Sequence, residues 1–464
     1  GKTRMLKINM RIENQEGFSV PYETEVFIKR HGEFGLTQIG KLSDEHFDEK
    51  EEGIGELQNI FVPAFDANGK MELHAASHII KHKTTHGHLF IKTKSGRSVQ
   101  ASKGHSVFVL REGEVKTLQT KELKIGDYLV IPGKVPESHT LTQVALTKFV
   151  ENKNYQIHGE VFKPIKGGNF RIPEEEQFFL KVNCDDMKSL AKFLGYYIAE
   201  GHIDYGKCNR PTLSFNANEE NTLVKDTIEC VGKAFGLKCS IFRPHGTEIQ
   251  VRINNTLLAE FLEKIGVGKG AKNKRVPNLI YNLSIENQTE FLKAYFARDG
   301  YHYKNGSIGY RAAKTASKQL VSDLAYLLLQ QGISSKIKGP FVEKARMLKG
   351  QYLKESIAYK IYFTESDYQK VGHQIGYLPF ALPIHEMRLN ELIPLIKDVK
   401  LKQLARIYVR NYRTKGRQLI GRELLRKMFS NAESNQKEFL TLCKFLNGDL
   451  RVDEIIELTE KEMP

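Results

Sequence analysis

Residues 193–201 and 292–300 carry the same motif, repeated at an offset of 99 residues. Each segment begins with a bulky apolar residue, has a small residue followed by an aromatic pair, and ends in a carboxylate followed by glycine. The carboxylates are Glu200 and Asp299. A repeat of this kind predicts an internal duplication. We therefore expect two helices that meet at a pseudo-twofold axis, each bringing one acid to a shared point.

The small residues of the motif predict how closely the two helices pack. Gly195 and Ala199 lie four positions apart, on one face of a helix, where small side chains let two backbones approach. In the second copy Ala294 keeps this pattern and Arg298 breaks it. The packing is therefore expected to be similar in the two copies but not fully symmetric.

The ends of the two motif helices predict a metal site. Gly201 and Gly300 fit helix C-caps, where a positive φ is needed. Glu200 and Asp299 would then lie at the negative helix poles and near each other, and both effects raise a carboxylate pKa. A divalent cation reverses this repulsion, so the two acids, with the two glycines beside them, are the expected ligands. Mg²⁺ suits such an oxygen site, with Mn²⁺ as an alternative.

The overall charge favours a polyanionic partner. The chain has 464 residues, enough for two or three domains, and 70 Lys and Arg against 55 acids give a net charge of +15. Such a balance favours phosphate neutralisation, although a lysine-rich protein without such a partner has the same composition. The 40% apolar fraction excludes global disorder. No apolar run reaches the roughly 18 residues of a membrane helix, so no membrane partner is expected.

The cysteines indicate a reducing compartment. There are five of them, with no Cys-x-x-Cys spacing and no paired histidines. This pattern argues against a zinc site or a disulfide framework. We therefore expect a cytoplasmic location.

The pattern of apolar residues predicts a multidomain α+β fold. Residues 19–165 contain many short β-branched and aromatic runs separated by turn signals, which predicts an all-β domain. From about residue 186 the periodicity becomes helical, and an order of helix, strands and helices occurs twice up to about residue 365. Residues 166–375 are therefore expected to form one duplicated α+β domain.

Residues 376–450 are predicted to be a small helical and basic region. Between positions 397 and 427 there are eleven Lys or Arg and only two acids. A solvated helix face is the alternative, but the scarcity of acids favours contact with nucleic acid. The residues expected to contact DNA are Lys402, Arg406, Arg410, Arg413, Lys415 and Arg417.

The two motifs, the repeat size and the sequence from Lys274 to Pro277 resemble the LAGLIDADG homing endonucleases. The resemblance implies αββαββα topology in each copy, metal-binding catalytic acids at Glu200 and Asp299, and curved sheets on the DNA major groove. It also implies that Lys274 lies near the scissile phosphate. For the second active-site lysine, Lys360 is the candidate and Lys354 the alternative.

The N-terminal part resembles an intein splicing domain, the Hint fold, of the archaeal type. Ser19 begins a segment similar to the first splicing block, in which Ser or Cys attacks its preceding carbonyl. Ser102 and His105 match the block whose Thr-x-x-His activates that acyl shift. The resemblance implies that residues 1–18 are a possible remnant of the host protein, or extein. Residues 451–464 read like the start of the C-terminal strand, and the sequence stops before a His-Asn block, so complete splicing is not expected.

Taken with these resemblances, the sequence predicts an intein-encoded, monomeric, site-specific endonuclease. It would hydrolyse both strands of a long asymmetric double-stranded DNA site with Mg²⁺, and its other partners would be the host exteins. One alternative is a DNA-binding or regulatory protein that keeps the LAGLIDADG scaffold without cleavage. A second alternative is an RNA maturase or a free-standing endonuclease.

Overall fold

The computed structural model describes residues 19–48, 51–82, 87–111, 114–137, 141–165, 178–206, 208–305, 308–348, 351–353, 355–364, 387–388, 419–420 and 448–461. The predicted extein remnant, residues 1–18, lies outside these ranges. Of the predicted basic region, only short pieces are described. They include the paired strands β26 (Met387–Arg388) and β27 (Leu419–Ile420). The predicted DNA contacts Lys402, Arg406, Arg410, Arg413, Lys415 and Arg417 all lie outside the described residues.

The N-terminal part is built mainly from antiparallel strands, as the short apolar runs predict. One sheet has the order β2-β1-β4-β5, and β3 pairs separately with β6. These elements are β1 (Glu25–Arg30), β2 (Glu33–Gln38), α1 (Ile39–Ser43), β3 (Gly53–Glu56), β4 (Ile60–Phe65), β5 (Met71–Ala75) and β6 (His78–Lys81). A small core under this sheet contains Ile28, Leu42 and Ile60.

The second sheet of the N-terminal part brings in a strand from the far end of the chain. Its order is β10-β9-β11-β28-β7-β8, so β28 lies between two strands that precede it by more than 300 positions. The strands are β7 (His88–Thr93), β8 (Ser98–Ser102), β9 (Ser106–Arg111), β10 (Glu114–Gln119), β11 (Tyr128–Pro132) and β28 (Leu450–Lys461), with η1 (Thr120–Glu122). Ile455 of β28 is fully buried against Ile91 and Val109. The residues between β11 and β28 are therefore an insertion into one sheet.

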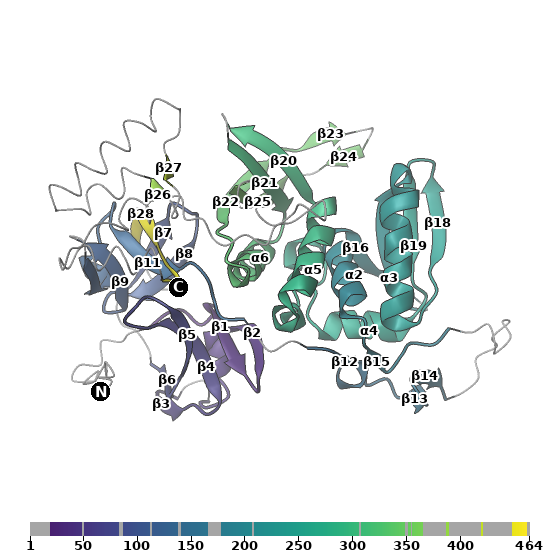
Figure 1. The fold of residues 1–464 in the computed structure, drawn as a ribbon, viewed down its shortest axis with the longest axis horizontal. Helices are drawn as coiled ribbons and strands as arrows, with labels where there is room; N and C mark the ends of the chain where they lie inside the picture. The colour runs from purple at the N-terminus through teal and green to yellow at the C-terminus, as the bar shows by residue number, and fades with distance from the viewer. Residues whose placement is uncertain are drawn as a thin grey trace, which may run out of the picture.

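A short connecting region leads into this insertion. It contains β12 (Val144–Ala145), η2 (Leu146–Lys148), β13 (Tyr155–His158), β14 (Val161–Pro164) and β15 (Asn183–Cys184). Figure 1 shows β12 and β15 below α4, and the β13–β14 hairpin farther from the N-terminal sheets.

The insertion contains the predicted duplication. The first copy has the sheet β16-β17-β19-β18 and the second has β20-β21-β25-β22, so both sheets have the same strand order. The first comprises α2 (Met187–Glu200), β16 (Gly201–Asp204), β17 (Arg210–Asn216), η4 (Ala217–Glu219), η5 (Glu220–Val224), α3 (Lys225–Phe235), β18 (Ser240–His245), β19 (Glu248–Arg252) and α4 (Thr256–Lys264). The two copies are linked by η6 (Ala271–Asn273) and η7 (Asn278–Asn282). The second comprises α5 (Ile285–Arg298), β20 (Gly300–Asn305), β21 (Ile308–Thr315), α6 (Lys318–Gln330), β22 (Lys336–Glu343), β23 (Arg346–Leu348), β24 (Gln351–Leu353) and β25 (Ser356–Thr364). The predicted α+β fold class is confirmed.

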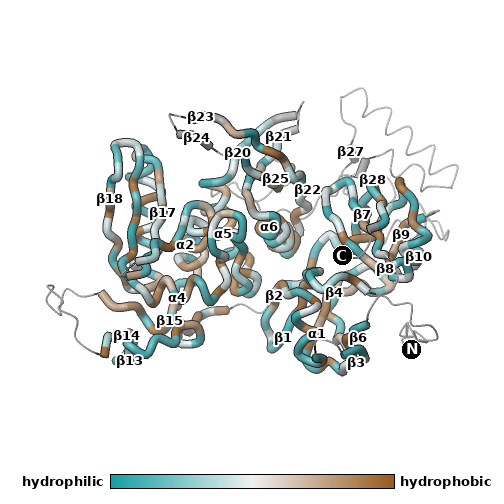
Figure 2. The backbone as a smooth tube through the Cα atoms, turned by 180° about the vertical axis from the view of Figure 1, so that it is seen from behind, coloured by the Kyte–Doolittle hydropathy of each residue, from teal (hydrophilic) through white to brown (hydrophobic). Residues whose placement is uncertain are grey.

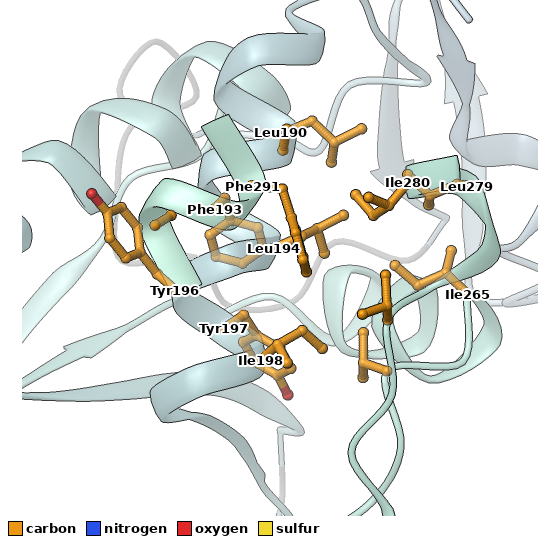
Figure 3. Close-up of a cluster of buried hydrophobic side chains, with 14 of the residues drawn as sticks. Leu190, Phe193, Leu194, Tyr196, Tyr197, Ile198, Ile265, Leu279, Ile280 and Phe291 are labelled. Carbon is orange, nitrogen blue, oxygen red and sulfur yellow. The ribbon is translucent and has the colours of Figure 1, made fainter. Parts of the chain in front are cut away.

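The helices α2 and α5 pack closely because small residues meet between them. A Cβ atom added at Gly195 would lie 2.4 Å from the carbonyl oxygen of Phe291 and 2.7 Å from the Cβ of Ala294. Figure 3 shows Leu194 and Phe291 in the apolar cluster beside this contact. In Figure 2 the α2 helix is coloured largely hydrophobic, in keeping with its central position. Each large apolar side chain fully buried here contributes roughly 1.5–3 kcal/mol.

Gly201 and Gly300 were predicted to follow the acids because a positive φ is needed there, and this reason is wrong. Gly201 has φ −84° and ψ 152°, an extended conformation, and neither it nor Gly300 has a positive φ. Both are instead required by close neighbours. An added Cβ would lie 2.3 Å from a ring carbon of Tyr197 at position 201, and 2.1 Å from the carbonyl oxygen of Phe296 at position 300. Each strand therefore starts directly after its motif helix, packed against the last helical turn.

Among the described residues, no helix is both long enough and apolar enough to cross a membrane.

Candidate active site

The two motif acids lie together at the ends of α2 and α5. Glu200 is the last residue of α2, and Asp299 is the C-cap of α5. Burial and the charge of Glu200 raise the pKa of Asp299, Lys274 lowers it, and the resulting pKa is about 7. The structure thus places Glu200 close enough for its charge to act on Asp299.

Arg298 makes this acid pair asymmetric. Its Nη2 atom donates to Oε1 of Glu200 at 2.8 Å, and its Nη1 atom pairs with Glu219. Its guanidinium also lies 5.1 Å from the ring centroid of Phe215. The sequence indicates Arg298 only as an exception to the small-residue pattern and does not predict its pairing with Glu200. A basic residue directly before the acid, present in one copy only, was the available signal.

Lys274 is directed to the same place from the segment that links the two copies. Its Nζ atom donates to the carbonyl oxygens of Tyr197 and Ile198, at 3.0 Å and 2.7 Å. These carbonyls belong to the last turn of α2, which is the negative end of its dipole. Burial lowers the pKa of Lys274 to about 8, although Asp299 and Glu200 favour its charged form. The structure therefore brings together three of the four predicted catalytic residues.

Lys360 lies in β25 of the second sheet, with its Nζ atom over tyrosine rings. Its Nζ atom is 3.7 Å from the ring centroid of Tyr303 and 5.1 Å and 5.3 Å from those of Tyr301 and Tyr362. The charges that shift the pKa of Asp299 come from Glu200, Lys274 and Arg298. Lys274 follows α4, so the matching position in the second copy would follow β25, beyond the described residues. Lys354 also lies outside them.

The donors at the acid pair fit a magnesium-type ion. Within the described ranges no group of three or more His, Cys, Asp or Glu side chains could hold a metal, so a protein-only cage is not formed there. Mg²⁺ commonly binds through one or two carboxylates and completes its shell with water and phosphate. Glu200 has one oxygen engaged by Arg298, and the raised pKa of Asp299 reflects a buried carboxylate that a cation would stabilise. Ligation by Gly201 and Gly300 remains a prediction.

The two sheets carry different side chains on their outer faces. On the first sheet, Arg252 donates to Gln250 at 2.7 Å, Gln250 donates to Glu248 at 2.9 Å, and Arg210 pairs with Asp204 at 3.1 Å. On the second sheet the cluster is aromatic and basic, and its members are Tyr301, Tyr303, Tyr310, Tyr362, Lys314, Lys338 and Lys360. The first face thus has many hydrogen-bonding groups, and the second has rings and cations.

The predicted splicing residues also lie together, in the N-terminal part. The backbone N–H of Ser19 donates to Oγ of Ser102 at 3.0 Å, and Ser102 N–H donates back to Ser19 O at 2.8 Å. His105 follows in the same turn, and burial lowers its pKa. Within the described part of the chain, Ser19 Oγ and His105 Nδ1 are buried and have no hydrogen-bond partner.

The C-terminal strand runs toward this cluster. Lys461 of β28 pairs with His88 of β7, and His88 pairs in turn with Ser102 of β8. Thr120 is a further member of this cluster that the sequence did not predict. Its hydroxyl donates to the carbonyl oxygen of Ser102 at 2.6 Å. Its role depends on a turn that brings it back to β8, which no local pattern reveals.

Comparison with known proteins identifies part of the duplicated unit. Residues 286–376 match a family model described as a LAGLIDADG-like domain. The LAGLIDADG-like domain predicted from the sequence is therefore confirmed over these residues.

The chain is similar to longer archaeal proteins. It is 28% identical over 321 residues to transcription initiation factor IIB of Methanocaldococcus jannaschii, a match covering 68% of this chain and 38% of that protein. It is 24% identical over 474 residues to the RNA polymerase subunit Rpo1C of the same organism, covering 95% and 52%. The chain thus spans less than two thirds of the length of these relatives.

Two solved structures are similar to parts of the chain. The crystal structure of the transcription factor IIB Mvu mini-intein is 28% identical, covers 25% of this chain and 70% of that chain, and gives a TM-score of 0.23. The crystal structure of I-DmoI in complex with DNA and Mn is 14% identical, covers 39% and 92%, and gives a TM-score of 0.26. Inteins and homing endonucleases, the two families named from the sequence motifs, are both represented among the similar structures.

Proposed function

We propose that this chain is an intein-encoded, site-specific endonuclease that hydrolyses both strands of double-stranded DNA. The observation that carries the proposal is the pair of acids at the ends of α2 and α5, the largely buried Asp299 and the partly exposed Glu200, with the Nζ of Lys274 beside them. Ordinary helix packing does not require two neighbouring carboxylates, one of them largely buried, and a buried lysine at one point. Perturbed pKa values in such a cluster are typical of functional sites.

Each residue of the site would have a separate role in phosphodiester hydrolysis. A divalent ion held by Glu200 and Asp299 would lower the pKa of an attacking water and neutralise charge on the phosphate. Arg298 orients Glu200 and leaves its second carboxylate oxygen for that ion. Lys274 supplies a positive charge close to the acids, where a phosphate approaching the site would be stabilised. Mg²⁺ is the proposed ion and Mn²⁺ the alternative.

Binding to DNA would combine charge with side chains that read bases. The net charge of +15 favours association with phosphates, and affinity should therefore fall with salt. Arg, Gln and Glu side chains on the first sheet match the groups that hydrogen-bond to base edges in the major groove. The second sheet carries tyrosines and lysines instead. Because the two faces differ, one monomer would recognise an asymmetric site.

The nuclease proposal is tested by plasmid nicking with Mg²⁺ or Mn²⁺, using plasmids that carry a library of inserted sequences. We expect the wild type to cut a subset of plasmids. Glu200→Gln and Asp299→Asn should each lower cutting by at least about 100-fold, because each removes a metal ligand. Glu286→Gln, an exposed acid in the first turn of α5, is the matched control and should cut like wild type. Equal inactivity of all four proteins on DNA that they bind would favour the non-catalytic DNA-binding alternative.

The N-terminal part would carry out the first step of protein splicing on a host protein. In that step Ser19 Oγ attacks the carbonyl of residue 18, the Phe18–Ser19 amide bond breaks to form an ester, and the freed amine of Ser19 takes up a proton. His105 would assist the departure of that amine.

Hydroxylamine should then release residues 1–18 from wild type but not from Ser19→Ala. Release from both proteins would rule out the ester. The proposed location is the cytoplasm.

A further inference from the structure

The outer edge of β2 is covered by two asparagines from the segment that links the two motif copies. Asn282 accepts from the N–H of Phe34 at 2.7 Å and donates to its carbonyl oxygen at 2.8 Å. Asn278 does the same for Leu36, at 3.0 Å and 3.3 Å. An edge strand presents alternate residues with both backbone groups free. Two asparagine side chains four positions apart therefore take the place of a neighbouring strand.

Arg275, in the same segment, joins an acid of the N-terminal part to one of the duplicated unit. Its guanidinium is bidentate with Asp323 of α6, at 3.1 Å and 2.8 Å, and its Nη2 atom lies 2.6 Å from Oε1 of Glu25 in β1. The Asp323 side chain is fully buried, and that of Glu25 is 9% exposed. Asp323 also accepts from the N–H of Val276 at 3.0 Å. The bidentate hydrogen bonds to Asp323 fix the geometry of the segment on one side, and the ion pair with Glu25 holds it by charge on the other.

Lys274 immediately precedes these anchors. Its own carbonyl oxygen accepts from Ser317 Oγ at 2.7 Å, and the next N–H, of Arg275, donates to Val267 O at 3.0 Å. Its side chain extends to the end of α2, whereas the side chain of Arg275 extends to β1 and α6. The linking segment, residues 274–282, is therefore attached to the acid pair at one end and to the β1–β2 hairpin along its length.

Apolar contacts complete this interface. The ring of Phe27 in β1 lies 5.4 Å, centroid to centroid, from that of Tyr281 in the linking segment and 5.4 Å from that of Tyr326 in α6. Phe27, Phe34 and Leu36 belong to the same hydrophobic core as α2 and α5. In Figure 1 the β1–β2 hairpin lies on the side of the N-terminal part that faces the helices.

We propose that the β1–β2 hairpin of the N-terminal part positions Lys274 for the nuclease reaction, through Glu25, Arg275 and the two asparagines. Glu25 is then a positioning residue that never touches DNA or the reacting atoms. This inference rests on the proposed function for its catalytic consequence, whereas the anchoring itself is a property of the fold. A displacement of about 1 Å at a reacting group can lower a rate by roughly 100-fold, so loss of this support should reduce catalysis more than binding.

The test uses the full chain with Glu25→Gln, which removes the charge but keeps the shape, and Glu23→Gln, an exposed acid two positions away, as the matched control. Hydrogen exchange of residues 274–282 should rise by about fivefold or more in Glu25→Gln, because local opening becomes easier. Single-turnover cleavage at saturating DNA should fall about 10- to 100-fold, with the Kd for DNA changed less than about twofold. Glu23→Gln should match wild type in all three measurements.

Two results would overturn the proposal. Unchanged exchange over residues 274–282 in Glu25→Gln would show that the hairpin does not hold the segment. Raised hydrogen exchange over residues 274–282 with an unaltered cleavage rate would show that the anchoring by the hairpin does not position Lys274. If the wild type cleaves no DNA, the proposed nuclease function fails separately, and the exchange measurement alone decides whether the hairpin anchors the segment. Asn282→Leu provides a second variant at an independent contact, and the same shift in exchange is expected for it.

Discussion

Lys274 and Asp299 are ionisable side chains held where little water reaches them. Burial moves the pKa of Lys274 down to about 8 and that of Asp299 up to about 7, so each charged form is disfavoured by its surroundings. Each shift is a free-energy cost of keeping the charge in the folded state. A fold selected for stability alone would place neutral residues at both positions. The residues that would bind metal and phosphate are therefore expected to lower the stability of the protein.

Asp299→Asn should increase stability, and the increase should depend on pH. The folded pKa of Asp299 is raised above the value of about 3.9 expected in the unfolded chain, so the carboxylate costs nothing below pH 4. The cost grows as pH rises from about 4 to 7 and is complete above pH 7. We expect the variant to gain about 2–4 kcal/mol in free energy of unfolding at pH 8 and little at pH 4. Urea denaturation at the two pH values measures this. An equal gain at both would contradict the assignment.

At the scale of elements, the α2–α5 contact explains why the motif tolerates only small residues at its centre. Gly195 is in contact with the backbone of α5, and Leu194 and Phe291 fill the space beside it. The contact brings the two helix ends, and with them the acids, to one point. The same feature was the strongest prediction from the sequence, because a spacing of four residues directly specifies a helix face.

Gly195→Ala should destabilise the protein even though alanine is the better helix former. The new Cβ would lie 2.4 Å from Phe291 O, which is backbone and cannot move aside easily. We expect a loss of about 1–3 kcal/mol in thermal or urea unfolding. Gly232→Ala on α3 is the matched control, because its Cβ would meet no atom closer than 3.9 Å. That variant should gain roughly 0.5–1 kcal/mol. A similar change in both variants would contradict the close contact.

The sheet faces make a separate prediction about Lys360. Its Nζ atom lies over the rings of Tyr303 and Tyr301 on the sheet face, which favours a role in holding DNA over the catalytic role expected from the sequence. Lys360→Met should therefore weaken DNA binding and reduce the slope of log affinity against log salt by about one. Its single-turnover rate at saturating DNA should stay within about twofold of wild type. A large fall in that rate with unchanged binding would restore the catalytic assignment.

At the scale of the whole molecule, the sequence predicted what is encoded locally and missed what depends on distant contacts. The duplicated helices, the all-β start and the acid pair follow from short patterns. The pairing of Arg298 with Glu200 crosses between the two copies, and the surroundings of Lys360 depend on strand register. The cover on β2 by Asn278 and Asn282 joins positions more than 240 residues apart. No periodicity in the sequence could reveal such contacts.

In the whole molecule the duplicated unit interrupts the six-stranded sheet β10-β9-β11-β28-β7-β8, and a shared core joins this unit to the N-terminal part. β28 returns to lie between β11 and β7, and β1 and β2 contribute Phe27 and Phe34 to the core around α2 and α5. The proposed nuclease and splicing sites are thus built on parts that support each other. Because the two halves of the proposed nuclease are unequal in sequence and surface chemistry, the two DNA strands should be treated unequally.

Strand-resolved, single-turnover cleavage of a duplex target tests whether Glu200 and Asp299 are needed for DNA hydrolysis. The wild type, Glu200→Gln, Asp299→Asn and the Glu286→Gln control would be compared with Mg²⁺ and each strand labelled separately. A metal-binding role of Glu200 and Asp299 predicts cutting of both strands by wild type and control, and a loss of about 100-fold or more on at least one strand in each acid variant, with DNA binding retained. Cleavage of both strands at wild-type rates by Glu200→Gln or Asp299→Asn would contradict it.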